Sequence, residues 1–220
     1  MKRGEPISAS LQHLVLQPEN NRSPRTAIVA LHGRGTDAHD LLPLVESLGI
    51  GDAIIVAPRA PRRYDFRGGY TWYDLSEQGV PEPHTFRESL DLLRKFLIEI
   101  KTGYRIDTAK LILLGFSQGT VMSYATGLLD VANTQAIVAL SGYIPLRSGL
   151  EYEWDKAANL AVFVSHGTYD KLIPISLAQE SVERLKDAGT NLTYKEYAMG
   201  HEVREETLQD LRAWIRRELG

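Results

Sequence analysis

One short segment near the middle of the chain constrains the fold more than any other. The apolar run 110–114 leads into Gly115-Phe116-Ser117-Gln118-Gly119, and apolar residues then recur at helical spacing. A Gly-x-Ser-x-Gly segment between a strand and a helix predicts a sharp turn that exposes the serine hydroxyl, with the glycines leaving room for strand and helix to approach. The alternative is that Ser117 only caps the helix. Residues elsewhere in the chain are needed to distinguish a nucleophilic serine from a capping serine. The apolar positions of the helix are Val121, Met122, Ala125, Leu128 and Leu129.

Short β-like runs alternate with helical patterns along all 220 residues. Several of these runs are apolar on both faces, which is typical of a parallel sheet covered by helices on both sides. The sequence therefore predicts a single α/β domain spanning residues 1–220, with a mostly parallel central sheet. The predicted strands are 13–17, 26–31, 53–57, 110–114, 135–140, 160–165 and 193–197. The predicted helix stripes are Phe86, Leu90, Leu93, Leu97 and Ile100; Leu177, Val182 and Leu185, ended by Gly189; and Leu208, Leu211, Trp214 and Ile215.

Composition excludes several functional classes. The net charge is −3 with acidic and basic residues interspersed, so we expect no nucleic-acid partner. No apolar stretch approaches the length of a membrane span, and no signal-like segment follows Met1, so we expect a cytoplasmic protein. The chain has no cysteine, which removes disulfides and thiolate metal sites. No two histidines stand at metal-ligand spacing, so we predict no metal.

Reactive residues also follow two later predicted strands. Asp170 comes shortly after the strand 160–165, and His201 comes shortly after the strand 193–197. In a parallel sheet the carboxyl ends of the strands meet at one edge, where ligands bind. Taken alone, Asp170 is better explained as a turn residue and His201 as a helix start. Together with Ser117, in the order serine, acid, histidine, they predict a catalytic triad in which His201 is the base and Asp170 orients it.

Such a site needs two backbone N–H groups for the oxyanion that forms during attack on a carbonyl. We expect one from Gln118, at the start of the helix after Ser117. We expect the other from Arg34, in the loop His32-Gly33-Arg34-Gly35 that follows the strand 26–31. The remaining histidines have smaller predicted roles: His32 and His166 shape loops through local hydrogen bonds, and His13, His39 and His84 show no partner pattern.

These residues together resemble the phospholipase/carboxylesterase family of α/β-hydrolases, which includes acyl-protein thioesterases and small bacterial carboxylesterases. The resemblance runs along nearly the whole chain. The residues that carry it are Leu31-His32-Gly33-Arg34-Gly35, Ala57-Pro58-Arg59-Ala60-Pro61, Trp72-Tyr73-Asp74, Gly115-Phe116-Ser117-Gln118-Gly119, Ala139-Leu140-Ser141-Gly142, His166-Gly167-Thr168-Tyr169-Asp170 and Gly200-His201.

The resemblance implies the α/β-hydrolase fold without a separate cap domain, and cofactor-free hydrolysis of carboxylic esters or thioesters. The triad Ser117, Asp170 and His201 and the oxyanion donors Arg34 and Gln118 match by position. Arg34 departs from the apolar residue that is common there, and Arg62, Arg63 and Arg67 lie nearby in the sequence. A purely apolar acyl path is therefore not expected.

The leading hypothesis is a serine carboxylesterase that acts on small esters with short- to medium-chain acyl groups. One alternative is an acyl-protein thioesterase or lysophospholipase, and another is a non-catalytic ligand-binding module on the same fold. The stretch 58–83 is rich in Pro, Gly, Arg and aromatic residues. We expect Trp72 and Tyr73 within it to line a substrate pocket, although aromatic residues there could instead form a dimer contact. The oligomeric state and the natural substrate stay open.

Overall fold

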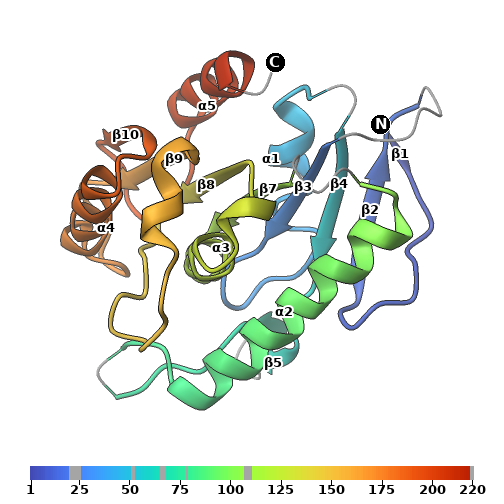
Figure 1. The fold of residues 1–220 in the computed structure, drawn as a ribbon, viewed down its shortest axis with the longest axis horizontal. Coiled ribbons are helices and arrows are strands. Elements are labelled where there is room, and N and C mark those ends of the chain that lie inside the picture. The colour runs from blue at the N-terminus through green and yellow to red at the C-terminus, as the bar shows by residue number, and fades with distance from the viewer. Residues whose placement is uncertain (20–25, 51–52, 65–67, 78, 107–110, 219–220) are drawn as a thin grey trace.

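A computed structural model describes residues 1–19, 26–50, 53–64, 68–77, 79–106 and 111–218. Its centre is an eight-stranded sheet in the order β1-β2-β4-β3-β7-β8-β9-β10 (Figure 1). β2 pairs antiparallel with β1 and with β4, and the other neighbouring strands of this sheet run parallel. The strands are β1 (Lys2–Arg3), β2 (His13–Gln17), β3 (Thr26–Leu31), β4 (Ala53–Pro58), β7 (Leu111–Phe116), β8 (Ala136–Leu140), β9 (Ala161–Gly167) and β10 (Asn191–Tyr197).

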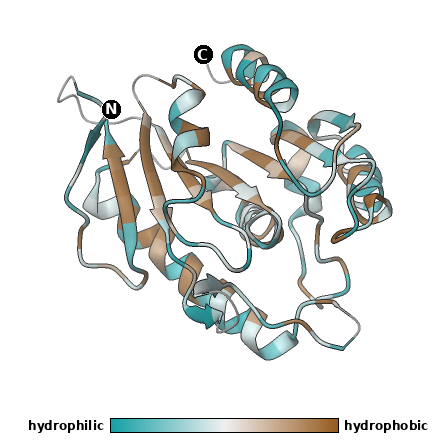
Figure 2. Cartoon of the chain, turned by 180° about the vertical axis from the view of Figure 1, so that it is seen from behind, coloured by the Kyte–Doolittle hydropathy of each residue, from teal (hydrophilic) through white to brown (hydrophobic). Residues whose placement is uncertain are grey.

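Helices cover both faces of this sheet, because successive strand residues point to opposite sides and most are apolar. On β3, Val29 packs into the cluster that contains residues of α2 and α3, whereas its neighbour Ile28 packs into the cluster with α1 and α5. α4 covers the end formed by β8 and β9. The central strands of the sheet are the most apolar part of the ribbon (Figure 2). The mostly parallel sheet with helices on both faces is thus confirmed. The helices are α1 (Leu42–Ser47), α2 (Pro83–Gly103), α3 (Gln118–Leu128), α4 (Ile175–Asp187) and α5 (Glu205–Glu218).

The longest helix, α2, begins where local chemistry favours it. Pro83 occupies the first turn, and the Glu82 carboxylate accepts hydrogen bonds from the N–H groups of His84 (3.0 Å) and Thr85 (2.8 Å). The predicted stripe from Phe86 to Ile100 is buried against the sheet. None of the helices in the described ranges combines the length and the apolar composition that a bilayer span requires.

The structure differs from the sequence prediction mainly in short elements. α1 was not predicted, because six residues are too few to show a helical period. The unassigned stretch 58–83 contains a two-stranded hairpin of β5 (Arg62–Tyr64) and β6 (Gly69–Thr71). The stretch 141–159 is irregular except for a 3₁₀ turn, η3 (Trp154–Asn159). Lys110, the first residue of the predicted strand 110–114, and Arg67 lie outside the described residues.

Candidate active site

The serine predicted to be the nucleophile lies at the turn between β7 and α3. Ser117 has φ 55° and ψ −119°, a conformation that costs a non-glycine residue energy and is found mainly at functional sites. Its N–H donates to the Leu140 carbonyl at 3.0 Å and its carbonyl accepts from Val121 N–H at 3.2 Å, so both neighbouring elements hold the turn. The backbone of Ser117 therefore has the geometry expected of a nucleophile elbow.

Glycines allow the elbow to pack directly against neighbouring backbone. A Cβ on Gly119 would lie 1.8 Å from the Leu31 carbonyl oxygen, and one on Gly115 would lie 2.3 Å from the Gly119 carbonyl carbon. A Cβ on Gly33 would lie 3.5 Å from the Ser117 Cβ. The start of α3, the end of β3 and the loop after it thus converge on Ser117, as the predicted oxyanion hole requires.

Asp170 and His201 form the second half of the site. The His201 Nδ1 lies 2.7 Å from the Asp170 Oδ2, across 31 residues of sequence. The other carboxylate oxygen, Oδ1, accepts from the N–H groups of Leu172 (2.9 Å) and Ile173 (3.0 Å). Since the carboxylate accepts from Nδ1–H, the His201 Nε2 keeps the lone pair that a general base needs.

The carboxyl group of Asp170 is fully buried yet ionised. Burial alone would raise its pKa, but the hydrogen bonds from Ile173 N–H, His201 and Leu172 N–H outweigh it, so the pKa of Asp170 lies below its usual value. A buried negative charge beside His201 stabilises the imidazolium that forms when this histidine accepts a proton.

The loops that carry Asp170 and His201 pack on each other and beside the elbow. A Cβ on Gly167 would lie 2.3 Å from the carbonyl oxygens of Met199 and Gly200, so these loops touch through backbone. The His201 ring packs against the ring of Phe116, the residue before Ser117, with centroids 4.9 Å apart and the ring planes tilted by 47°. The described structure records no hydrogen bond from Ser117 to His201; without substrate this contact is often long and tightens on the bound ester. The complete triad stays a prediction.

Two backbone N–H groups next to Ser117 are free to bind an oxyanion. Gln118 is the first residue of α3, and the N–H groups of a first helical turn have no acceptor within the helix. Arg34 lies in the loop after β3, beside Gly33. Within the described ranges neither the Arg34 N–H nor the Gln118 N–H has an acceptor. The assignment of these two donors remains a prediction that this geometry favours.

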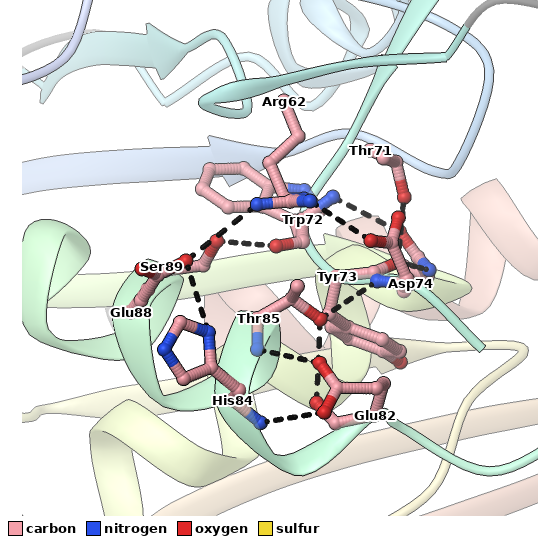
Figure 3. Close-up of polar contacts among 11 residues, drawn as sticks. Arg62, Thr71, Trp72, Tyr73, Asp74, Glu82, His84, Thr85, Glu88 and Ser89 are labelled. Carbon is pink, nitrogen blue, oxygen red and sulfur yellow. Dashed lines mark hydrogen bonds and ion pairs between the residues drawn. The ribbon is translucent and has the colours of Figure 1, made fainter. Parts of the chain in front are cut away.

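The Gln118 side chain performs a task that the sequence did not indicate. Its Oε1 accepts from the Thr71 hydroxyl (2.9 Å) and from Trp72 N–H (3.1 Å), and its Nε2 donates to the Tyr73 carbonyl (2.9 Å). Ser89 on α2 donates to the Trp72 carbonyl (Figure 3). One amide thus ties the elbow to residues 71–73, about 46 positions away, and no short-range pattern signals such a contact.

Trp72 and Tyr73 lie in the core rather than on an open surface. They are 0% and 2% exposed, and the Trp72 indole N–H donates to the His32 carbonyl at 2.9 Å. Tyr73 packs edge-on against Phe86 of α2, with ring centroids 5.4 Å apart. The Trp72 contact supports the loop after β3 at His32. Contact with substrate, the role expected for the two aromatic residues, stays a prediction.

The two histidines expected to shape loops have local partners. His32 Nε2 accepts from Ala60 N–H (3.0 Å), and its Nδ1 lies 2.7 Å from the Gly33 carbonyl. His166 Nε2 donates to the Ile173 carbonyl at 2.9 Å. Both expectations are confirmed. Across the described part of the chain, no three histidine or carboxylate side chains converge where they could hold a metal ion.

A cavity of about 540 Å³ is lined by Leu172 and Ile173, which hold the Asp170 carboxylate through their N–H groups. The rest of its lining comes from residues 76, 79–81, 83 and 86, from the loop 143–148 after β8, and from residues 174, 177 and 180. Gly142 lies against the Ser117 carbonyl, and Ile173 N–H donates to Asp170, so two of the lining segments are continuous in sequence with residues that contact Ser117 and Asp170. Its side chains are largely apolar, among them Val80, Phe86, Ile144, Leu146 and Leu177. A smaller cavity of 330 Å³, lined by Gln135 and Leu160 among others, lies at the opposite ends of β8 and β9, away from Ser117.

Comparison with known proteins identifies the family to which this fold and candidate site correspond. The model of the family described as Phospholipase/Carboxylesterase matches residues 13–219. Acyl-protein thioesterase 1 of Candida albicans is 31% identical over 218 residues, covering 90% of this chain and 94% of that protein. Carboxylesterase SOBER1 of Arabidopsis thaliana is 26% identical over 208 residues, covering 89% and 91%. The crystal structure of esterase PE8 superposes with a TM-score of 0.85 at 27% identity, covering 95% of this chain and 99% of that one.

Proposed function

Because this chain belongs to the phospholipase/carboxylesterase family and is a carboxylic ester hydrolase, we propose that it cleaves short- to medium-chain carboxylic esters through Ser117, His201 and Asp170. The observation that carries the proposal is the 2.7 Å contact between His201 and the buried Asp170, beside an elbow that holds Ser117 at positive φ.

The proposed reaction follows from the positions of the protons. The Ser117 hydroxyl attacks the ester carbonyl while His201 Nε2 takes its proton. The N–H groups of Arg34 and Gln118 bind the oxyanion of the tetrahedral intermediate. The intermediate collapses as His201 returns the proton to the departing alcohol, which leaves an acyl group on Ser117. Water then attacks this acyl-enzyme by the same route, releasing the acid and restoring the serine hydroxyl.

The 540 Å³ cavity supports an acyl-binding role, because its volume falls in the range of about 300–1,000 Å³ typical of small-molecule sites. The sequence favoured short acyl groups because arginines cluster in the stretch 58–83. Arg62 instead pairs with Asp74 (2.9 Å) and Glu88 (3.5 Å), and the Arg34 guanidinium lies over the Tyr64 ring. Neither side chain lines this cavity, whose lining is largely apolar apart from a few polar residues, among them Arg147, which pairs with Glu180 at 3.2 Å.

The large apolar share of this lining favours a second candidate of the same chemistry. An acyl-protein thioesterase or lysophospholipase needs an apolar path for a long acyl chain, and a relative of 31% identity is named acyl-protein thioesterase 1. A thioester would react through the same serine, with a thiol in place of the alcohol as leaving group. Acyl chain length and leaving group together separate this candidate from the first.

The test is hydrolysis of p-nitrophenyl esters from acetyl to dodecanoyl, and of matched thioesters, by wild type and Ser117→Ala. We expect Ser117→Ala to abolish turnover. Ser123→Ala is the matched control, since this buried serine on α3 has a hydroxyl without a partner in the described residues. It should keep wild-type rates.

The results of these assays distinguish the two candidate functions from each other and from failure of the proposed triad. A short-chain ester optimum that is lost in Ser117→Ala supports the carboxylesterase. A long-chain or thioester optimum moves the assignment to the second candidate. Near-wild-type turnover by Ser117→Ala, or failure of a fluorophosphonate to label Ser117, would overturn the triad.

A further inference from the structure

A second histidine lies against the predicted triad acid, beside the same carboxylate oxygen that His201 contacts. His166 is the penultimate residue of β9, and its side chain is fully buried. Its Nε2 donates to the Ile173 carbonyl at 2.9 Å and lies 3.4 Å from Asp170 Oδ2, the oxygen that accepts from His201. The triad mechanism proposed above does not use this imidazole.

The contacts of His166 close a ring around the Asp170 carboxylate. Ile173 N–H donates to Asp170 Oδ1, and the carbonyl of the same Ile173 accepts from His166. The turn 170–173 is therefore held at Ile173 by two hydrogen bonds. The Asp170 carboxylate accepts from its N–H group, and the His166 imidazole donates to its carbonyl. Without the imidazole, the Ile173 carbonyl would lose its partner, and the turn that supplies two N–H groups to Asp170 would loosen.

Three observations indicate that His166 stays neutral. Donation from Nε2 leaves Nδ1 as an acceptor, and this buried atom has no partner within the described residues. Burial lowers the pKa of His166, although the negative charges of Asp170 and Glu196 act to raise it. The positive form of His201 would disfavour a second positive charge here. A neutral imidazole can orient the carboxylate without competing with His201 for its charge.

We propose that His166 is a positioning residue for the triad, which holds the turn 170–173 so that the Asp170 carboxylate stays aligned with His201. This inference rests on the proposed function, since it assigns a support to that triad. It predicts an effect on the chemical step rather than on substrate binding.

The test compares His166→Leu, which removes the N–H donor, with His166→Gln, whose amide nitrogen can occupy the position of Nε2. Rates are normalised to active sites counted with a fluorophosphonate. We expect His166→Leu to lower kcat by about 10- to 100-fold with little change in KM, the range seen when a group that holds a functional side chain from behind is removed. We expect His166→Gln to recover most of the loss. The acid limb of the kcat/KM profile should move to lower pH in His166→Leu and return in His166→Gln, because a misaligned carboxylate stabilises the imidazolium less.

His13→Leu is the matched control. His13 is also a buried histidine with two hydrogen bonds, to the Leu11 carbonyl and the Tyr104 hydroxyl, but it lies on β2. It should lose comparable thermal stability and keep kcat. If His166→Leu does not fold, His166→Asn takes its place, since its shorter amide cannot reach Ile173 and should remain slower than His166→Gln.

An unchanged kcat in His166→Leu, or a kcat loss that His166→Gln fails to recover and His13→Leu shares, would overturn the proposal. A wild-type enzyme that neither turns over esters nor reacts with the fluorophosphonate would instead overturn the triad itself, so the two failures are distinguishable.

Discussion

The two halves of the candidate site are held in place by different forces. Around Ser117 the support is backbone against backbone, with Gly115 and Gly119 in contacts that no Cβ could enter. Around Asp170 and His201 a backbone contact at Gly167 is joined by hydrogen bonds to one buried carboxylate, from two backbone N–H groups and one imidazole. The half around Ser117, the nucleophile half, should therefore lose stability when a side-chain atom is added to its glycines. The half around Asp170 and His201, the acid–base half, should lose activity when a hydrogen-bond donor or acceptor is changed.

Adding one methyl group to the nucleophile half should have the largest effect. In Gly119→Ala the new Cβ would lie 1.8 Å from the Leu31 carbonyl oxygen, so β3 and α3 have to separate. We expect a loss of about 3 kcal/mol or more in the free energy of unfolding, measured by urea titration. Gly200→Ala is the control, because a Cβ there meets nothing within 4 Å. An equally stable Gly119→Ala would contradict the contact.

Changing a single atom in the acid–base half should leave the fold intact and stop the chemistry. In Asp170→Asn the amide oxygen can still accept from Leu172 and Ile173, but the amide NH₂ then faces His201 and favours the wrong tautomer. We expect kcat to fall by about 10³- to 10⁴-fold. Steady-state kinetics, alongside circular dichroism to confirm folding, measure this; a loss below tenfold would argue against Asp170 as the triad acid.

Acid should destabilise both halves through buried histidines. Burial lowers the pKa of His32 in the nucleophile half, of His166 in the acid–base half and of His13. Below about pH 6.5 these histidines bind protons in the unfolded chain but not in the folded protein. The free energy of unfolding therefore decreases as the pH is lowered. One such group contributes at most about 1.4 kcal/mol per pH unit.

The pKa of Asp170 is also lowered, but its contribution is lost mainly below about pH 4, where more than half of the unfolded carboxylate is protonated. The two effects are therefore separated on the pH axis. Urea midpoints at pH 8, 7, 6 and 5 measure the histidine effect, and a flat series over that range would show that these imidazoles titrate normally.

The smallest effect is expected outside both halves, at the ion pairs of Arg62 with Asp74 and Glu88 (Figure 3). These side chains are about half exposed, so Arg62→Ala should cost at most about 1 kcal/mol and the cost should shrink at high salt. Thermal melts in low and high salt test this. A larger loss would mean that residues 71–74 depend on this outer pair as much as on Gln118.

The long buried elements were predictable because their pattern is strong. β3, β4, β7 and β8 are apolar on both faces, and the structure places each within one or two residues of its prediction. β5 and β6 have three residues each and contain Arg or Gly, so neither propensity nor alternation marks them. Their pairing depends on contacts that the local sequence does not encode.

The candidate site divides in the same way. Asp170 and His201 could be placed together because each follows a strand, and β9 and β10 are neighbours in a parallel sheet. The bonds from Gln118 to residues 71–73 and from His166 to Ile173 could not, since side-chain direction across distant segments leaves no periodic trace. The cavity was missed for the same reason: three separate loops build it.

The position of β10 at the edge of the sheet has a consequence for thermal inactivation of the protein. β7, which presents Ser117, has a strand on each side, whereas β10, which leads to His201, is the last strand of the described sheet and, among the described residues, pairs with β9 alone. Local opening begins where hydrogen bonds are fewest, so amide protons of β10 should exchange with solvent before those of β7. On gentle heating His201, the predicted general base, would then move away from Ser117 while the rest of the sheet is still folded. Activity would be lost at a lower temperature than the fold.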